Sequence, residues 1–323
     1  MAAPPLLAVE GLTTHFVTDE GVFRAVEDLG FTLARGEFLG LVGESGCGKT
    51  TAMLSLLRLL PASGRIVAGR VLLEGTDLLG LPEAEMRRVR WRRISLIFQG
   101  AMNALNPVRT VGDQIAEALV IHGMQPGLRA ARPRVDELLD WVGIGGGRAG
   151  LFPHQFSGGM RQRAMIAMAL ACDPQVVIAD EPTTALDVMV QAQILELLER
   201  LQRELGLAVI LVTHDLSVVA EVCHRVLVMY GGMLAEYAPV DAAFNHPLHP
   251  YTRMLLEAFP DLTRLEGRLA SIAGSPPRMN ALPPGCRFAP RCPLAVERCR
   301  RETPAARRLA DDHWAACHLA EGP

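Results

Sequence analysis

One stretch, Gly43-Glu44-Ser45-Gly46-Cys47-Gly48-Lys49-Thr50, constrains this chain most, because it fits the pattern G-x-x-x-x-G-K-[ST] without a mismatch. Residues 38–42 before it are apolar, as in a buried strand. Residues 51–60 after it have the composition of a helix, which Pro61 ends. The sequence therefore predicts a strand, a glycine-rich loop and a helix in that order.

Each part of this loop suits a phosphate ligand. Its glycines let backbone N–H groups close around the β- and γ-phosphates at the positive end of a helix. Lys49 adds a point charge there, and the Thr50 hydroxyl can ligate Mg²⁺. The alternative is an ordinary glycine-rich turn with a stray lysine, and the flanking strand and helix argue against it. We expect a site for a nucleoside triphosphate.

Length and charge narrow the class of protein. A chain of 323 residues, 50% of them hydrophobic, can bury one large core and leave a smaller appendage. The net charge of −3 gives no general attraction to nucleic acid, and the arginine-rich residues 87–93 are typical of a solvated helix face. The N-terminus lacks the pattern of a signal peptide, and the longest apolar run, residues 164–172, is too short to span a bilayer. We expect a soluble cytoplasmic protein with no nucleic-acid partner.

The segment before the loop predicts a small β-layer. Residues 6–34 alternate apolar and polar positions around a turn at residues 19–21, as in two antiparallel strands. Phe16 could offer a face on which a purine stacks, with Phe23 as the reserve candidate. A phenylalanine in a strand is also a common core residue, so the pattern leaves both roles open.

Polar residues follow the later predicted strands. A strand is expected at residues 69–74, a short helix after Pro82, and a buried strand at residues 94–98 that runs into Gln99. Residues 176–179 form another apolar strand, followed by Asp180 and Glu181. Ligands of open α/β sheets bind at such strand ends. Asp180 is placed to hold Mg²⁺ and Glu181 to deprotonate a hydrolytic water.

Residues 100–155 resemble a helical insertion, with helix-period segments at residues 110–122 and 133–142. At its end Ser157 is a candidate N-cap, and Gly158 and Gly159 would let the backbone approach an anion closely. A helix over residues 188–204 and a strand over residues 208–212 follow, and His214 comes just after that strand. His214 would either cap the helix beginning at Asp215 or join the other candidates at the sheet edge.

The last forty residues hold Cys286, Cys292, Cys299 and Cys317, separated by five, six and seventeen residues. In a reducing compartment such a group favours metal or cluster ligation over disulfides. Zinc, an iron–sulfur cluster and free thiols all remain open, and His313 and His318 keep zinc possible. The segment has few apolar residues, so we expect something other than burial to hold it.

The order of these motifs resembles the nucleotide-binding subunit of ATP-binding-cassette (ABC) transporters over roughly residues 5–260. The amino-acid sequences of residues 42–49, 156–170 and 249–252 resemble those of the oligopeptide/dipeptide (peptide/nickel) importer branch. The sequence of the tail at residues 285–293 resembles that branch too. Two departures are Met160, where glutamine is common in the wider superfamily, and Gly100-Ala101, where Asp-Pro is usual. The second puts in doubt only the detail of coupling to the membrane subunits.

The resemblance implies a role for each matching position. It implies adenine stacking by Phe16; phosphate binding by Gly43, Glu44, Ser45, Gly46, Cys47, Gly48, Lys49, Thr50 and Thr51; Mg²⁺ binding by Thr50, Gln99 and Asp180; catalysis by Glu181 as base, with Gln99 and with His214 as γ-phosphate sensor; and contacts across a dimer by Ser157, Gly158, Gly159 and Asp187. It also implies a [4Fe-4S] cluster on Cys286, Cys292, Cys299 and Cys317, and we expect a structural role for it because these cysteines lie in sequence well outside the ATPase motifs.

As a whole, the resemblance implies a P-loop α/β core with an antiparallel β-layer, a helical subdomain near residues 100–170 and a small irregular C-terminal module. The expected domains are residues 1–260 and 261–323. The expected function is hydrolysis of ATP, with Mg²⁺, to power a peptide importer from the cytoplasmic face of the membrane. Partners would be a second ATPase subunit of the same or another kind, two permeases and, through the complex, a solute-binding protein.

Several alternatives remain at this point. The same kind of subunit serves importers of nickel or other small solutes, and the sequence does not identify the solute. A soluble ABC ATPase outside transport is disfavoured because the chain has one cassette and no coiled-coil insertion. The motifs at Ser157 and Asp187 disfavour a P-loop kinase. An inactive interaction protein is disfavoured because every chemical residue is present.

Overall fold

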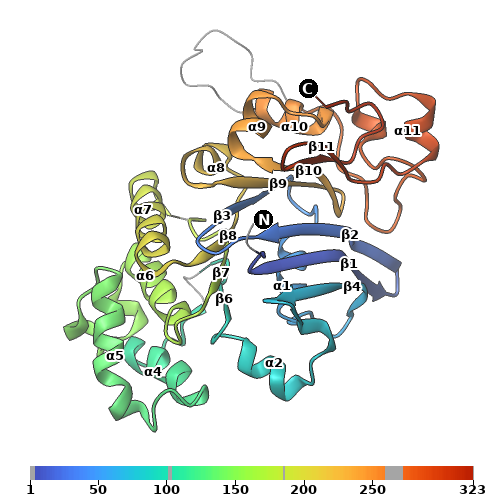
Figure 1. The fold of residues 1–323 in the computed structure, drawn as a ribbon. Helices are drawn as coiled ribbons and strands as arrows, with labels where there is room; N and C mark the ends of the chain where they lie inside the picture. The colour runs from blue at the N-terminus through green and yellow to red at the C-terminus, as the bar shows by residue number, and fades with distance from the viewer. Residues whose placement is uncertain (1–3, 101–103, 185, 259–271, 323) are drawn as a thin grey trace. The chain divides into compact units, whose positions relative to one another are not determined.

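The structure is a computed structural model that describes residues 4–100, 104–184, 186–258 and 272–322 (Figure 1). It consists of two compact units, which we describe separately. Unit 1 comprises residues 1–34, 39–80 and 213–323, and unit 2 comprises residues 35–38 and 81–212. The expected domain boundary at residue 260 lies outside the described residues.

An antiparallel sheet forms the first layer of unit 1, with the strand order β2-β1-β4-β5 (Figure 1). Its strands are β1 (Leu7–Thr18), β2 (Gly21–Leu33), β4 (Gly64–Leu73) and β5 (Thr76–Asp77). The expected pair of strands before the phosphate loop is confirmed. The expected start of β4 near Gly69 is wrong, because β1 is long enough to pair with β4 as far as Phe16 and Gly64. Gly69, with φ at 103°, lies where the register shifts, so it marks a bulge inside the strand.

The other strands of unit 1 lie in the order β11-β12-β10-β9-β3. They are β3 (Phe38–Val42), β9 (Arg225–Tyr230), β10 (Met233–Pro239), β11 (Arg307–Ala310) and β12 (His313–Ala315). β3 is parallel to β9, and the later pairs are antiparallel. The helices of this unit are α1 (Lys49–Leu56), α8 (Leu216–Val222), α9 (Val240–Asn245), α10 (Pro250–Glu257) and α11 (Glu297–Arg301). The C-terminal segment is therefore less irregular than expected, since β11 and β12 extend a sheet.

Burial does help to hold the C-terminal segment, which corrects the expectation from its composition. Phe288 is only 2% exposed and packs against Tyr230 and Tyr251, with ring centroids 5.0 and 5.3 Å away. Glu236 on β10 is completely buried and lies 2.6 Å from Nε2 of His313 on β12. The described part of the segment contributes only a small buried cluster, formed by Ala315, Cys317 and Ala320 with Leu309 and Leu248 packed against it. It is held because it shares the aromatic core and a buried polar pair with the rest of unit 1.

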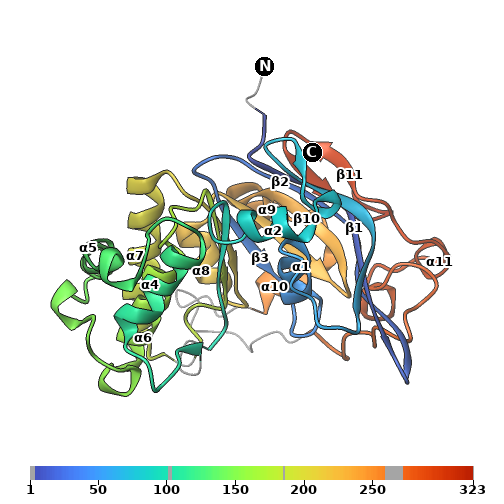
Figure 2. The ribbon, with the colours of Figure 1, turned by 90° about the horizontal axis from the view of Figure 1, so that it is seen from below.

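Unit 2 contains parallel strands in the order β8-β7-β6. They are β6 (Ile94–Ile97), β7 (Val176–Asp180) and β8 (Ala208–Val212). Its helices are α2 (Glu83–Val89), α4 (Val111–Ile121), α5 (Leu128–Trp141), α6 (Gly158–Ala169) and α7 (Val188–Leu205). Figures 1 and 2 show α4, α5, α6 and α7 grouped together, and the expected P-loop α/β fold with a helical subdomain is confirmed.

One helix boundary in unit 2 differs from expectation. α5 begins at Leu128 and not at residue 133, so Pro133 lies inside the helix. The buried positions Ala131, Val135 and Leu138 continue the apolar face on both sides of the proline. Burial of this face therefore outweighs the backbone hydrogen bond that Pro133 cannot donate. Residues 101–103, at the start of the expected insertion, lie outside the described residues.

Candidate functional site

The phosphate loop in unit 1 follows β3 and leads into α1. Gly43, Gly46 and Gly48 all have positive φ, at 150°, 77° and 101°. A Cβ atom on Gly43 would lie 2.2 Å from the carbonyl oxygen of Met229, and one on Gly48 would lie 2.2 Å from that of Ala25. Both positions require glycine for conformation and for space. The neighbouring backbone of β9 and β2 thus fixes the curve of the loop.

Lys49 points back into its own loop. Its side chain is buried, and Nζ donates to the carbonyl oxygens of Gly43 at 2.6 Å and Glu44 at 3.2 Å. Ser45, Gly46 and Thr50 are exposed. The amine is thus held in the loop where phosphate oxygens would compete for it, and the Thr50 hydroxyl is accessible at the start of α1.

His214 lies beside the strand that carries the loop. The N–H of Thr213 donates to the carbonyl of Leu41 on β3 at 3.1 Å, and His214 follows with an exposed side chain. Asp215 is the N-cap of α8, accepting from the N–H of Ser217 at 2.9 Å. The cap is therefore Asp215, and the alternative role considered for His214 is wrong.

Phe16 and Phe23 face each other across β1 and β2. Both side chains are half-buried. The structure therefore leaves both open as the surface on which a purine could stack.

The acidic residues of unit 2 lie where expected, at the end of β7. Asp180 is the last residue of the strand and is buried. Oε2 of Glu181 accepts from Nε2 of Gln99 at 2.6 Å and from Oγ1 of Thr184 at 2.9 Å. Gln99 reaches Glu181 because β6 and β7 are adjacent and parallel, so their carboxyl ends meet.

The backbone of Glu181 is unusual. Its φ is 46°, in the left-handed region that a non-glycine residue rarely adopts, and its N–H donates to the carbonyl of Val212 at 2.9 Å. This bond and the contacts from Gln99 and Thr184 determine where the carboxylate points. Sequence reasoning missed Thr184, although its place three residues after Glu181 is a usual spacing for such a local contact.

Further candidate site residues lie at the N-termini of two helices in unit 2. Ser157 caps α6, accepting from the N–H of Met160 at 3.3 Å, as predicted. Asp187 caps α7, accepting from the N–H of Val190 at 3.0 Å. A Cβ atom on Gly159 would lie 2.7 Å from Cγ1 of Val190, so this glycine allows α6 and α7 to pack closely. That packing is a second reason why a glycine is needed at position 159, besides access for an anion. Ala185, which precedes Asp187 in the same motif, lies outside the described residues.

The four C-terminal cysteines are free thiols in the structure. Burial raises the pKa of Cys286 to about 11, and the nearby thiols of Cys299 and Cys317 raise it further. Burial likewise raises the pKa of Cys292, with a contribution from the same two thiols. Electrostatic coupling of this kind requires the groups to be near one another.

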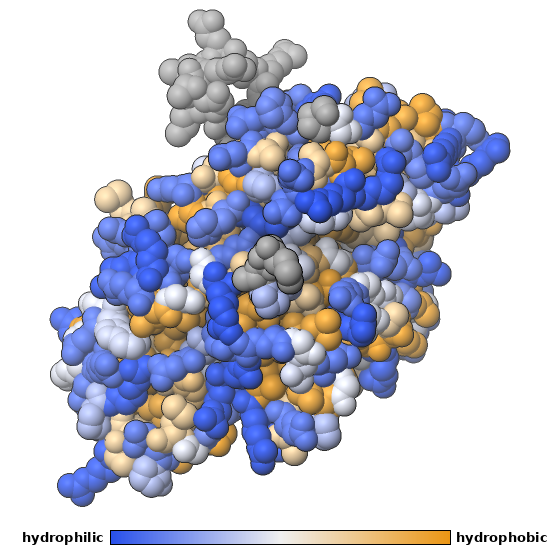
Figure 3. Space-filling model, viewed as in Figure 1, coloured by the Kyte–Doolittle hydropathy of each residue, from blue (hydrophilic) through white to orange (hydrophobic). Residues whose placement is uncertain are grey.

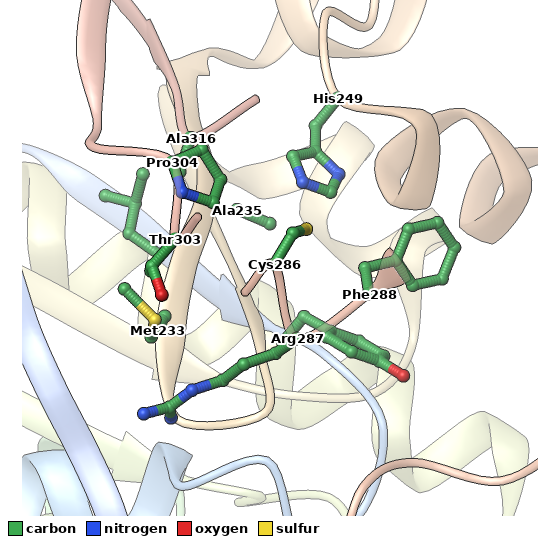
Figure 4. Close-up of a pocket in the computed structure, with 11 residues that line it drawn as sticks. Met233, Ala235, His249, Cys286, Arg287, Phe288, Thr303, Pro304 and Ala316 are labelled. Atoms are coloured by element: carbon green, nitrogen blue, oxygen red, sulfur yellow. The ribbon is translucent and has the colours of Figure 1, made fainter. Parts of the chain in front are cut away.

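The donor chemistry suits a metal or cluster, but the geometry does not match a metal site. Within the described residues no group of three or more His, Cys, Asp or Glu side chains is arranged to hold a metal ion. His313 contacts Glu236, and Nε2 of His318 lies 2.9 Å from the carbonyl oxygen of Glu302. Figure 4 shows the Cys286 thiol pointing toward His249 in a cavity of about 20 Å³, which has room for little more than a water molecule.

Two residues far along the chain contact the phosphate loop, and sequence reasoning missed both. The N–H of Glu44 donates to the hydroxyl of Tyr251 at 3.0 Å. The guanidinium of Arg291 donates to the two carboxylate oxygens of Glu44 at 2.6 and 3.0 Å. The C-terminal segment, although well outside the phosphate-loop motif in sequence, therefore contacts the phosphate loop in the structure.

No helix among residues 4–100, 104–184, 186–258 and 272–322 is long and apolar enough to cross a membrane. The face in Figure 3 shows hydrophilic and hydrophobic residues interspersed.

Comparisons with known proteins agree with this geometry. Residues 26–184 match the ABC transporter family, and residues 235–299 match the family described as "Oligopeptide/dipeptide transporter, C-terminal region". The chain is 50% identical to a probable peptide ABC transporter ATP-binding protein of Sinorhizobium fredii, over 97% of this chain and 94% of that protein. It is 46% identical to a dipeptide transport ATP-binding protein of Escherichia coli, over 97% of this chain and 96% of that protein.

Solved structures give the same assignment. A dimeric ATP-binding cassette in a post-hydrolysis state, bound to ADP and Pi, superposes with a TM-score of 0.64 and 28% identity, covering 72% of this chain and 98% of that one. With the loop at Lys49 and the acids after β7, these similarities establish the family: the chain belongs to the ATP-binding subunits of ABC transporters and is an ATP hydrolase of that family.

Proposed function

We propose that this chain powers an importer of dipeptides or oligopeptides. The observation that carries the proposal is the similarity to relatives named for dipeptide and oligopeptide transport, at 46% and 49% identity over 97% and 92% of this chain. The match of residues 235–299 to the C-terminal region of such transporters supports it, since that region lies outside the general ABC match.

Within this proposal the predicted site residues and Thr184 have the following roles. Gly43 to Thr51 bind the phosphates, Phe16 stacks on adenine, and His214 contacts the γ-phosphate. Glu181 accepts the proton of the attacking water, and Gln99 and Thr184 orient its carboxylate. Oxygen atoms of Thr50, Gln99 and Asp180 are of the type that Mg²⁺ prefers. Bound Mg²⁺ would offset the charge on the phosphates.

We further propose that residues 1–260 form the nucleotide-binding domain and that two such domains act as a dimer. Ser157, Gly158, Gly159 and Asp187 would meet the ATP bound by the other subunit. The position of Ser157 at the exposed N-terminus of α6 supports this role, because helix N-termini favour anions. The second subunit would be a copy of this chain or a related cassette.

A groove in unit 2 is the proposed contact with the permeases. It measures about 260 Å³ and is lined by both apolar and polar side chains. Among its lining residues are Trp91, Asn106, Glu117, Ile121 and Met168. Ile121 is 71% exposed, which leaves an apolar side chain at the groove available to a partner. The subunit would thus be a peripheral protein on the cytoplasmic face of the membrane, working through the complex with a solute-binding protein.

Uptake into proteoliposomes tests the importer. Vesicles containing the two permeases, the cassette pair and the solute-binding protein should take up a labelled peptide only with ATP. Ile121→Asp should reduce binding of the subunit to these vesicles at least about tenfold, because it places a charge in the proposed contact. Val67→Asp, at an exposed valine of unit 1, is the matched control and should bind normally. Equal binding of the subunit to protein-free liposomes, or uptake of nickel in place of peptide, would contradict the proposal.

The four C-terminal cysteines are proposed to hold a [4Fe-4S] cluster with a structural role. This proposal is supported by the resemblance of the tail and by the presence of four cysteines within the last forty residues. A cluster would order a short chain whose own buried core is small.

Anaerobic purification tests this assignment. The native protein should be brown, with about four iron atoms per chain, and Cys292→Ser should remove the colour and increase proteolysis of the C-terminal segment. Cys172→Ser, at a buried cysteine of unit 2, is the control and should keep the colour. Stoichiometric zinc in a colourless protein, or no bound metal, would reject the cluster.

A further inference from the structure

We propose that Arg291, in the C-terminal segment, is a positioning residue for the ATP site: it neutralises Glu44 in the phosphate loop and so raises the affinity for ATP. The inference rests on the assignment of residues 43–51 to the phosphates. It gives the C-terminal segment a direct part in nucleotide binding.

Arg291 is built into the C-terminal segment and reaches the loop from there. Its side chain is 6% exposed. Besides the two bonds to Glu44, it donates to the carbonyl oxygens of Ala273 at 2.9 Å and Ile272 at 3.0 Å, and to the hydroxyl of Tyr230 at 3.2 Å. The hydrogen bond to Glu44 raises the pKa of Arg291 above the already high value of an ordinary arginine, so the guanidinium is always charged. Such a buried, bidentate ion pair has a fixed geometry.

The charge on Glu44 matters for ATP binding because Glu44 lies in the phosphate loop itself. It is the first residue after Gly43, and its carbonyl accepts from Nζ of Lys49 at 3.2 Å. Its own N–H is fixed by Tyr251. Without Arg291, the carboxylate of Glu44 would be an unneutralised negative charge in a loop that must receive a triphosphate. The pair with Arg291 removes that repulsion before ATP arrives.

A second arginine of the segment supports the loop indirectly. The guanidinium of Arg287 donates to the carbonyl of Gly231 and pairs with Glu27. The N–H of the next residue, Gly232, donates to the carbonyl of Cys47 in the loop at 2.9 Å. Figure 4 shows the Arg287 side chain extending away from His249, on the opposite side from the Cys286 thiol. The C-terminal segment therefore contacts the loop directly at Glu44 and, through the β9–β10 turn, near Cys47.

Two of the cysteines are adjacent in sequence to the two arginines that support the loop. Arg287 follows Cys286, and Arg291 precedes Cys292. Whatever orders the cysteines therefore orders the arginines that reach the loop. Order in this segment should consequently be visible in ATP affinity.

Titration of the full chain with ATP tests the proposal. Arg291→Met should raise the Kd for ATP about tenfold, which corresponds to about 1.4 kcal/mol. The KM for ATP should rise by a similar factor while kcat changes less than about threefold, because the lost contact acts on binding and not on the chemical step. Arg298→Met is the matched control: Arg298 pairs with Glu302 within the same segment, on an exposed face, and its loss should leave the Kd unchanged.

The double variant Glu44→Gln/Arg291→Met separates charge neutralisation from general loosening. Because it has no carboxylate to neutralise, its Kd should return to within about threefold of the native value. An unchanged Kd in Arg291→Met, or a double variant that binds as weakly as Arg291→Met, would overturn the proposal. If Arg291→Met does not fold, Glu44→Gln alone decides: it should bind ATP at least as tightly as the native chain, and weaker binding would overturn the proposal.

Failure of this inference is distinguishable from failure of the site assignment. If Lys49→Ala still binds ATP normally, residues 43–51 are not the phosphate site and the assignment itself fails. If Lys49→Ala loses ATP while Arg291→Met binds normally, only the role of Arg291 is rejected.

Discussion

Replacing Glu181 with glutamine is expected to lower the rate of ATP hydrolysis at least about 100-fold while the affinity for ATP stays within about threefold. The amide has nearly the same shape as the carboxylate, so the contacts from Gln99 and Thr184 have the same reach. An amide cannot accept the proton of the attacking water, however. Lys49 and the Mg²⁺ ligands are unchanged, so binding should survive. The variant should accumulate as an ATP-bound dimer.

A single-turnover assay with labelled ATP measures this loss separately from product release. The control is Glu199→Gln, which removes an exposed carboxylate that pairs with Arg203 on α7. That variant should hydrolyse ATP at the native rate. Undiminished hydrolysis by Glu181→Gln would remove Glu181 from its role as the base, and loss of ATP binding in that variant would show a structural role.

The contact between Gln99 and Glu181 illustrates what the sequence could predict. Both residues follow short apolar runs, and such runs predict buried strands of a parallel sheet. Adjacent parallel strands end at one edge, so proximity followed from the pattern without knowing the fold in detail. The cap Ser157 followed from local chemistry in a similar way, since its side chain accepts from an N–H three residues ahead.

Contacts between distant parts of the chain could not be predicted in this way. Glu44 and Arg291 are 247 residues apart, and neither lies in a periodic pattern that indicates its partner. Gly159 was predicted only as a glycine that lets an anion approach, and its close packing against Val190 on the next helix, 2.7 Å from where a Cβ atom would lie, was not predicted. Gly69 resembled a strand start, but the length of β1 makes it a bulge. In each case the deciding contact comes from a separate element, so local preference alone was insufficient.

Replacing Lys49 with alanine is expected to raise the Kd for ATP at least about 100-fold, because it removes the only positively charged side chain of residues 43–51. In the present structure that amine is buried and held by the carbonyl oxygens of Gly43 and Glu44. Lys49→Arg is an informative companion, since it keeps the charge but must fit a planar guanidinium into a space shaped for an ammonium group. We expect it to bind ATP more weakly than the native chain.

The sequence offers a direct measurement of this lysine, because Lys49 is the only lysine among the 323 residues. An amine-selective reagent can therefore modify only Lys49 and the N-terminal amine, and mass spectrometry of the peptide containing residues 43–51 reports on Lys49 alone. Bound ATP should slow this labelling at least about tenfold, because the phosphates engage the amine and cover the loop. Adenosine, which has no phosphates, is the matched control and should give no protection. Equal labelling with and without saturating ATP would show that Lys49 does not contact the nucleotide, even if Lys49→Ala were inactive.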